Sequence, residues 1–261
     1  MRAIVCLSIL SALLFTTGCR TVSRPGEPLV RHGDEIVAAG QFFRIGTPVV
    51  LWTDPGGYDA YRVERRFGPI EKSDWKSLLA DKKTEQSEPS PNRYSLRRRE
   101  LTPAELERVR GGGWDLPLLQ RVVDQFVLHY DVAGISRTCF RVLHDERNLS
   151  VHFMLDVDGT IYQTLDLKER AFHATTSNDR SIGIEIANVG PLKEAPGKPN
   201  QLNWWPNNFG TKWCDKTETA KFVKASYRGF DHYAAYTNPQ FASVKALVDH
   251  LCSTFSIPKT L

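Results

Sequence analysis

The sequence predicts an α/β fold in which a mixed central β-sheet is flanked by helices. Three observations indicate this fold: apolar runs of strand length, an Asp-Gly pair between two of these runs, and a final segment with helical periodicity. The predicted elements, in chain order, are a strand at 125–130, a helix from 136 to about 144, a hairpin of 152–157 and 160–164, a strand at 182–186 and a helix from 238. This order is typical of a mixed sheet covered by helices.

Local signals support each of these elements. Residues 125–130 form one apolar run, and Ser136 can cap the helix that follows. Asp158-Gly159 suits a two-residue hairpin turn, which needs positive φ angles. Every second residue of 182–186 is isoleucine, as in a strand with one buried face. Asn238-Pro239 can start the last helix, whose apolar residues recur at three- and four-residue steps: Phe241, Val244, Val248, Leu251 and Phe255.

The main domain is predicted to begin near residue 101. Thr102-Pro103-Ala104-Glu105 is a capping box with proline at the first helical position, and the short helix it opens should end before Gly111. Residues 81–100 are polar and indicate a solvated linker, with a basic patch as the alternative. Residues 36–70 contain short apolar runs broken by Asp54-Pro-Gly-Gly57, which indicates a small hairpin. Residues 19–100 are therefore interpreted as a tether and an N-terminal accessory region.

The first residues are typical of a targeting segment. Arg2 is followed by an apolar stretch at 3–15, too short to span a bilayer, and small residues lead to Cys19. This pattern resembles a bacterial lipoprotein signal at 1–18, with Cys19 as the lipidated residue; ordinary signal-peptide cleavage is the alternative. Three cysteines remain, so at most one disulfide pair can form: Cys139, Cys214 and Cys252.

Residues 190–237 form a long insertion that is rich in aromatic residues. Loops of this length in a compact domain are usually functional or disordered, and the aromatic content argues against disorder. Two interpretations are open: a platform on which sugar rings stack, and a small subdomain with its own core. The aromatic residues are Trp204, Trp205, Phe209, Trp213, Phe222, Tyr227, Phe230, Tyr233 and Tyr236.

Three motifs resemble those of one enzyme family across roughly residues 122–190. They are an apolar strand ending in His129, the pair His173-Ala174 after a hairpin, and Ser181-Ile-Gly-Ile-Glu185-Ile. Together they resemble the zinc-dependent N-acetylmuramoyl-L-alanine amidases, which share their fold with peptidoglycan recognition proteins. The resemblance implies that His129 binds zinc, that Glu185 orients the zinc-bound water and moves its proton, and that His173 and Asn178 line the substrate groove.

Chemistry gives His129 and Glu185 separate support. Zinc with three protein ligands and one open position lowers the pKa of bound water to about 7 and polarises a carbonyl, as amide hydrolysis requires. An imidazole at a strand end is placed at the rim of the sheet, although such a histidine is more often simply hydrogen-bonded. Glu185 shares its strand face with Gly183 and Ala187, which should leave a shallow space for substrate. The alternatives for Glu185 are an ion pair with an arginine such as Arg180 and a position on a solvated sheet edge. His152 is expected to form hydrogen bonds in the core.

Within this family two further zinc ligands come from a C-terminal segment with Gly-His and Asp-Pro-Gly. No such segment follows Asn238 in this sequence, so the domain at 101–261 is expected to be C-terminally incomplete. Three functions remain open: zinc-dependent hydrolysis of the N-acetylmuramoyl-L-alanine amide in peptidoglycan, peptidoglycan binding without catalysis by a degenerate or truncated zinc site, and a purely structural envelope lipoprotein.

Composition is consistent with the first two functions. The chain of 261 residues is 41% apolar and 25% charged, as in soluble globular proteins. Its net charge of +4 is too small to indicate nucleic-acid binding, but it suits approach to an anionic cell wall. We expect a monomer that binds peptidoglycan or muropeptides, is anchored to a membrane through Cys19, and lies on the periplasmic or extracytoplasmic side of the cell envelope.

Overall fold

A five-stranded mixed sheet forms the centre of the computed structural model, which describes residues 30–61, 97, 100–110, 113–147, 149–204 and 211–259. The strand order is β3 (Val49–Leu51), β6 (Ile161–Gln163), β5 (Phe153–Leu155), β7 (Ser181–Ile186) and β4 (Gln125–Tyr130). Only the β5–β6 hairpin pair is antiparallel among these neighbours. The predicted mixed sheet is therefore confirmed. Cys19, the segment 1–18 and most of the expected linker lie outside the described residues.

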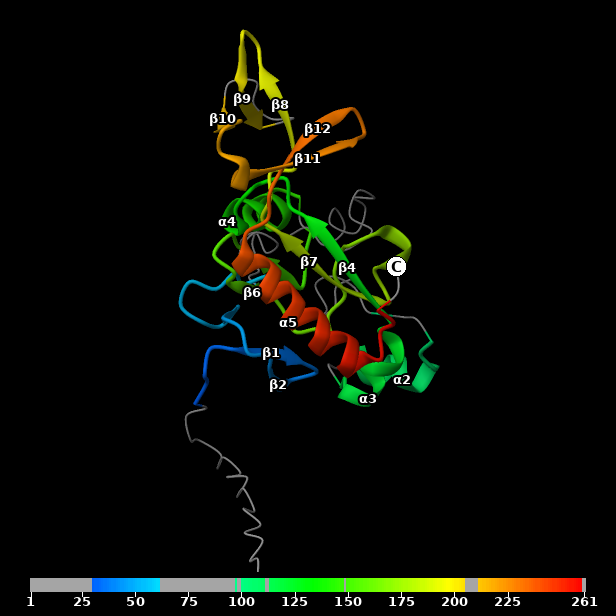
Figure 1. Ribbon diagram of the computed structural model, residues 1–261. Coiled ribbons are helices and arrows are strands. Elements are labelled where there is room, and N and C mark those ends of the chain that lie inside the picture. The colour runs from blue at the N-terminus through cyan, green and yellow to red at the C-terminus, as the bar shows by residue number, and fades with distance from the viewer. Residues whose placement is uncertain are drawn as a thin grey trace, which may run out of the picture. The chain divides into compact units, whose positions relative to one another are not determined.

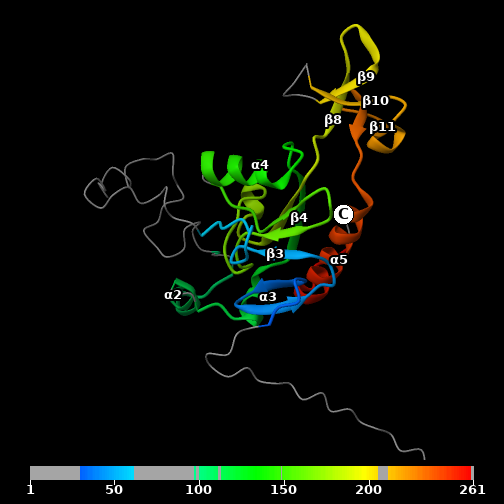
Figure 2. The same cartoon turned by 90° about the vertical axis from the view of Figure 1, so that its left-hand side faces the viewer.

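Helices cover both faces of this sheet (Figures 1 and 2). α5 (Asn238–Phe255) packs on one face with α3 (Leu116–Val122), against a core that includes Phe153, Leu155 and Ile184. α4 (Ser136–Phe140), continued by the π-helical turn η2 (Arg141–Glu146), packs on the other face, where Met154 points. Successive strand residues point to opposite faces, so the β5 strand supplies both cores. None of the described helices is long and apolar enough to cross a membrane.

Several helix signals differ from expectation in detail. The last helix is capped by Thr237, whose hydroxyl accepts from the Gln240 amide at 3.2 Å, rather than by Asn238. Phe241 is 59% exposed, because the buried face of α5 is formed by its neighbours Gln240, Ser243 and Leu247. Ser136 lies inside α4 and its side chain makes no capping bond.

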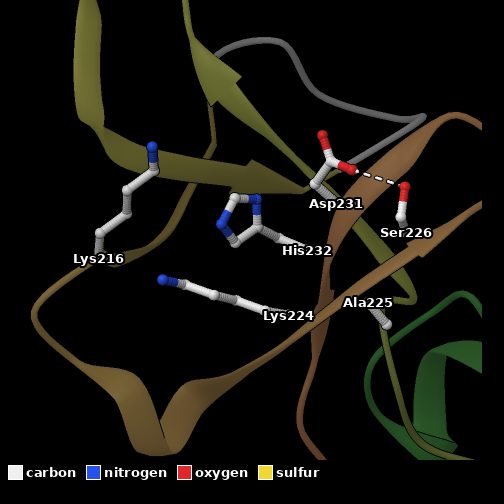
Figure 3. Close-up of a pocket in the computed structure, with 6 residues that line it drawn as sticks. All are labelled: Lys216, Lys224, Ala225, Ser226, Asp231 and His232. Carbon is white, nitrogen blue, oxygen red and sulfur yellow. Dashed lines mark hydrogen bonds between the residues drawn. The ribbon is translucent and has the colours of Figure 1, made fainter.

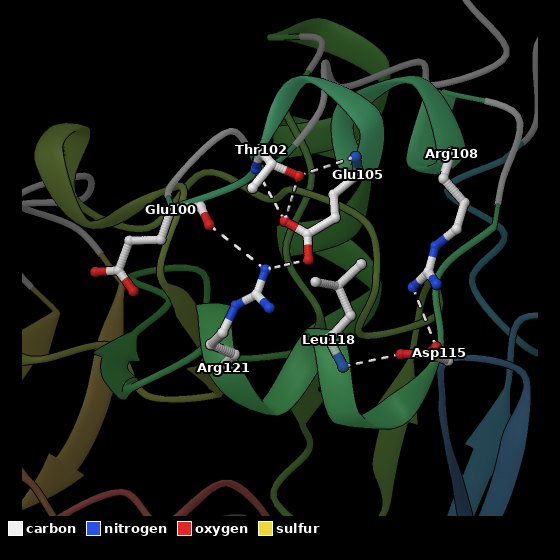
Figure 4. A network of polar contacts seen from close by, with 7 residues as sticks. All are labelled: Glu100, Thr102, Glu105, Arg108, Asp115, Leu118 and Arg121. Atoms are coloured by element: carbon white, nitrogen blue, oxygen red, sulfur yellow. Dashed lines mark hydrogen bonds and ion pairs between the residues drawn. The ribbon is translucent and has the colours of Figure 1, made fainter.

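The predicted capping box at Thr102 and Glu105 is confirmed and belongs to a wider polar network (Figure 4). It opens α2 (Pro103–Arg110), and Arg121 of α3 pairs with Glu105 at 2.7 Å. Arg108 of α2 pairs with Asp115, which caps α3 by accepting from the Leu118 amide at 2.9 Å. These contacts hold the two short helices together at the start of the domain.

The N-terminal strands belong to the same compact unit as the rest of residues 32–261. β1 (Glu35–Ala38) and β2 (Gln41–Arg44) form a hairpin, whereas β3 joins the central sheet parallel to β6 instead of pairing in a hairpin of its own. Buried Gln163 of β6 accepts from the Val37 amide at 2.8 Å and donates to the Val37 carbonyl at 2.7 Å. The central core therefore extends well before the boundary expected near residue 101.

The aromatic-rich insertion folds as a second five-stranded sheet, which is antiparallel. Its own apolar cluster contains Leu192, Leu202, Cys214, Phe222 and Ala234. A subdomain with its own core is thus the interpretation that the packing supports. In spatial order its strands are β10 (Lys212–Asp215), β9 (Lys198–Trp204), β8 (Pro191–Ala195), β12 (Phe230–Ala234) and β11 (Phe222–Tyr227). Trp205 and Phe209 lie outside the described residues.

Candidate active site

His129 and Glu185 lie opposite each other on adjacent parallel strands. His129 is the fifth residue of β4 and is in register with Glu185 of β7. Side chains in register on neighbouring strands project from the same face, so the imidazole and the carboxyl share one side of the sheet near its rim. Ile182 and Ile184 point to the opposite face and are fully buried in the main core. The alternation of β7 therefore places Glu185 as the sequence predicts.

The His129 imidazole is partly buried, and this burial favours its neutral form. Burial lowers its pKa, while a backbone group of His173 acts in the opposite direction. Its Nε2 atom is buried and accepts or donates no hydrogen bond among the described residues. A neutral imidazole with a free ring nitrogen can accept a proton, donate one or bind a metal.

Glu185 has a strongly perturbed carboxyl group. Burial, with a smaller contribution from the negative charge of Asp131, raises its pKa to about 8, against the opposing influence of Arg147. The alternative ion pair with Arg180 does not form, because Arg180 binds Asp124. At neutral pH this carboxyl is mostly protonated, which suits a group that delivers a proton.

Asp131 is a site residue that the sequence analysis missed. Its Oδ1 accepts from the backbone amides of Ala133, Gly134 and Asn188 at 2.9–3.0 Å, so it joins the end of β4 to the loop after β7. Its Oδ2 is buried and has no hydrogen-bond partner within the described ranges. Burial raises the pKa of Asp131. The signal in the sequence is the Asp-x-x-Gly turn directly after the strand that ends in His129.

His173 lies next to His129 and forms a hydrogen bond with His152. The two rings of His129 and His173 are stacked with centroids 6.1 Å apart, and His173 Nε2 lies 2.8 Å from His152 Nδ1. His152 Nε2 in turn lies 2.9 Å from the guanidinium of Arg97, which is entirely buried. Burial and the charge of Arg97 hold the pKa of both His152 and His173 well below the usual range. The predicted core hydrogen bonding of His152 is confirmed.

The space expected above Gly183 is occupied. A Cβ atom at Gly183 would lie 2.2 Å from Nδ1 of His173, so the glycine is needed to admit that ring. The prediction of a shallow substrate space at this position was therefore wrong. Asn178 fixes the backbone of the loop that carries His173, because its side-chain oxygen accepts from the amides of His173 and Ala174 at 2.8 and 3.0 Å. The predicted contact of Asn178 and His173 with substrate stays a prediction.

An apolar groove lies beside His129 and has a volume of about 320 Å³. It runs between the end of β4 and the first turns of α5, and several of its apolar side chains are unusually exposed, Leu128 by 53% and Phe241 by 59%. Such a groove next to polar groups is typical of a ligand site. Its lining residues are Leu128, His129, Tyr130, Ile186, Tyr236, Gln240, Phe241 and Val244.

The described residues do not by themselves complete a zinc site. His129 offers one free nitrogen, Glu185 is in register with it on the neighbouring strand, and Asp131 follows it by two residues in the chain. Yet no three histidine, cysteine, aspartate or glutamate side chains of the described segments lie close enough together to hold a metal. Cys139, Cys214 and Cys252, of which at most one pair could have formed a disulfide, are all free thiols.

A mixed sheet covered by helices on both faces, with a histidine and a buried glutamate in register at its rim, defines a candidate ligand-binding site whose side chains can exchange protons. Residues 119–261 match the Amidase_2 family, described as N-acetylmuramoyl-L-alanine amidase, and the chain belongs to this family. No curated protein sequence matches the chain.

Solved structures with similarity to the chain include two amidases and a recognition protein. The E. coli N-acetylmuramyl-L-alanine amidase AmiD is 18% identical over 52% of this chain and 45% of its own, with a TM-score of 0.35. The endolysin amidase LysCS from Clostridium intestinale URNW is 20% identical over 53% and 67%, with a TM-score of 0.32. Drosophila peptidoglycan recognition protein SA is 14% identical over 53% and 64%, with a TM-score of 0.31. The matched region thus spans less than half of AmiD.

Proposed function

We propose that this protein binds peptidoglycan fragments in the groove beside His129 and hydrolyses the amide bond between N-acetylmuramic acid and L-alanine. The observation that carries the proposal is the in-register pair of His129 and Glu185 at the rim of the sheet, of which His129 also lines that groove. Membership of the amidase family supports the class of substrate. Zinc is the cofactor that we propose, with Nε2 of His129 as one ligand.

Glu185 is proposed to move the protons of the reaction. Hydrolysis adds water to the carbonyl carbon and breaks its bond to nitrogen, so one proton must leave the water and one must reach the departing amine. A carboxyl with its pKa raised to about 8 holds a proton at neutral pH and can deliver it to that nitrogen. Its ionised form can take the proton from water. Asp131 supports this role because its charge opposes ionisation of Glu185.

The second candidate function is recognition without cleavage. It is favoured by the ligand set, since only Nε2 of His129 and Nδ1 of His173, which packs against Gly183, lack hydrogen-bond partners among the described histidines of this rim, and no three-ligand cluster of described residues surrounds them. A binding protein of this kind would use the same groove. The two functions therefore differ in chemistry and share their ligand class.

Replacement of Glu185 distinguishes the two functions. In a zinc-loaded preparation that cleaves a muramoyl peptide, Glu185→Gln should lower turnover by about 100-fold or more and leave zinc content and peptide affinity unchanged. Glu107→Gln on the exposed face of α2 is the matched control and should behave as wild type. Binding without cleavage by wild type would favour recognition, and near-normal turnover of Glu185→Gln would remove Glu185 from the proton transfer.

We also propose that the protein is exported and anchored by a lipid on Cys19. The support is the sequence pattern at 1–19, which lies outside the described residues. Cells should incorporate a fatty-acid analogue into wild type and not into Cys19→Ser. An unlabelled, soluble wild-type protein would contradict the anchor and leave export open.

A further inference from the structure

A second groove lies on the inserted antiparallel sheet, with a volume of about 490 Å³ (Figure 3). It belongs to β11 and β12 and to the turn after β10, and none of the residues discussed at the candidate active site lines it. Its lining residues are Lys216, Lys224, Ala225, Ser226, Asp231 and His232.

The register of the strands brings a lysine and a histidine of this groove together. Lys224 of β11 is paired with His232 of β12, and His232 is paired with Leu192 of β8. Because directly opposed residues project from the same face, the Lys224 side chain and the His232 ring enter the same space. Figure 3 shows Lys216 approaching that space from the opposite side. The Phe222 ring meets the His232 ring edge-on at 5.4 Å and supports it.

Most of the net charge of the chain lies on this subdomain. Residues 190–237 contain seven lysines and arginines against four acidic residues, a net charge of +3, where the whole chain carries +4. Part of it is neutralised locally, since Lys216 pairs with Glu194 and Lys221 with Glu218. Lys224 makes no ion pair within the described segments, so its ammonium group is available in the groove.

Asp231 limits the chemistry of the ligand. It accepts a hydrogen bond from the Ser226 hydroxyl at 3.0 Å, and its carboxylate retains lone pairs for further donors. A ligand that carries only anionic groups, whether phosphates or carboxylates, would be repelled by this carboxylate. A ligand with carboxylates for the lysines and with hydroxyl or amide N–H groups for Asp231 satisfies both kinds of lining group.

We propose that this groove is a second binding site for the carboxylate-bearing sugar-peptide polymer of the cell wall. The inference rests on the proposed function, because the same polymer supplies the substrate of the site at His129. The groove on the inserted sheet binds a part of the polymer that is separate from the amide bond proposed to be cleaved near His129. It therefore raises affinity for the intact wall without contributing to binding of a single soluble muropeptide.

The test compares two double variants of the full chain that remove the same charge. Lys216→Gln/Lys224→Gln removes the two lysine charges that line the groove, whereas Lys198→Gln/Lys245→Gln removes those of two exposed lysines outside it. Co-sedimentation with purified, insoluble peptidoglycan should show an affinity about fivefold lower for the groove variant and nearly unchanged for the control, since each exposed charge contributes little by itself. Wild type should lose a similar share of affinity when the wall carboxylates are converted to amides.

Other outcomes overturn the proposal in distinguishable ways. Equal losses in the two variants would mean attraction by overall charge, and no loss in either would remove the groove from wall binding. Binding to phosphatidylglycerol vesicles and to inorganic phosphate is measured in parallel. If the groove variant lost affinity for these two probes and kept its affinity for peptidoglycan, the groove would be a phosphate site. Binding of a soluble muramoyl peptide, followed by NMR at His129, separates this test from the proposed function. Both variants should bind that peptide as wild type, and a wild type that fails to bind it contradicts the proposed function instead.

Discussion

The imidazole of His173 lies directly over Gly183, where a Cβ atom would approach its ring to 2.2 Å. Gly183 belongs to β7, two residues before Glu185, and His173 lies in the loop before that strand. The glycine thus lets one imidazole stand between buried His152 and the rim residue His129.

Gly183→Ala should force the His173 ring out of place. Overpacking of this kind costs about 1–3 kcal/mol, and the contact between His173 and His152 should be lost with it. Urea unfolding measures the change. The control is a double-mutant cycle with His173→Ala. Once the ring is removed, Gly183→Ala should lower the free energy of unfolding by less than it does in wild type. Equal costs in the two backgrounds would show that the ring does not occupy this space.

The contribution of Glu185 to stability should fall as the pH rises from about 4.5 to about 8, because this carboxyl holds its proton in the folded state and loses it when the chain unfolds. Its pKa is raised to about 8 in the fold, so the stabilising contribution is complete below 4.5 and is lost through pH 8. The slope for one proton approaches about 1.4 kcal/mol per pH unit. Denaturant unfolding at several pH values should show a flatter profile for Glu185→Gln, and an unchanged profile would contradict the raised pKa.

Gln163→Leu should destabilise the protein by about 2 kcal/mol or more. The Gln163 amide is fully buried, accepts from the Val37 N–H and donates to the carbonyls of Val37 and Leu165. Leucine would leave the buried Val37 N–H without this partner and would remove both donated bonds, although the Val37 carbonyl also accepts from the Leu167 amide at 3.3 Å. Gln41→Leu on the exposed side of β2 is the control and should change stability by less than about 0.5 kcal/mol. Comparable losses in thermal or urea unfolding would show that the buried bonds are not the cause.

Zinc added to the protein should perturb the ring of His129 before those of its two neighbours. Nε2 of His129 has no partner among the described residues, whereas His152 is hydrogen-bonded at both nitrogens. Nε2 of His173 is bonded to His152, and its Nδ1, although it has no partner either, is packed against Gly183. Histidine ring ¹⁵N signals recorded during a zinc titration measure the order. His129→Ala should remove the first response, and an initial response at His173 or His152 would mean that the metal enters elsewhere.

Local patterns were enough to predict the central sheet and its two site strands. The apolar run at 125–130, the Asp158-Gly159 turn and the alternating isoleucines of 182–186 each depend on neighbouring residues, and β4, β5, β6 and β7 form there. The same alternation placed Glu185 on the face away from the core. It could not show the partners across the sheet, since β3 and the β1–β2 hairpin join through pairings over a hundred residues apart.

Long-range packing determined the character of the site. The raised pKa of Glu185 comes from burial and from Asp131, and the pairing of β4 with β7 sets His129 beside it. The occupation of Gly183 by His173 and the support from Arg97 and His152 likewise join distant segments. Motif spacing identifies the residue types that such chemistry needs. Burial, register and the distance between charges arise only when the strands are assembled, because each depends on atoms contributed by several segments at once.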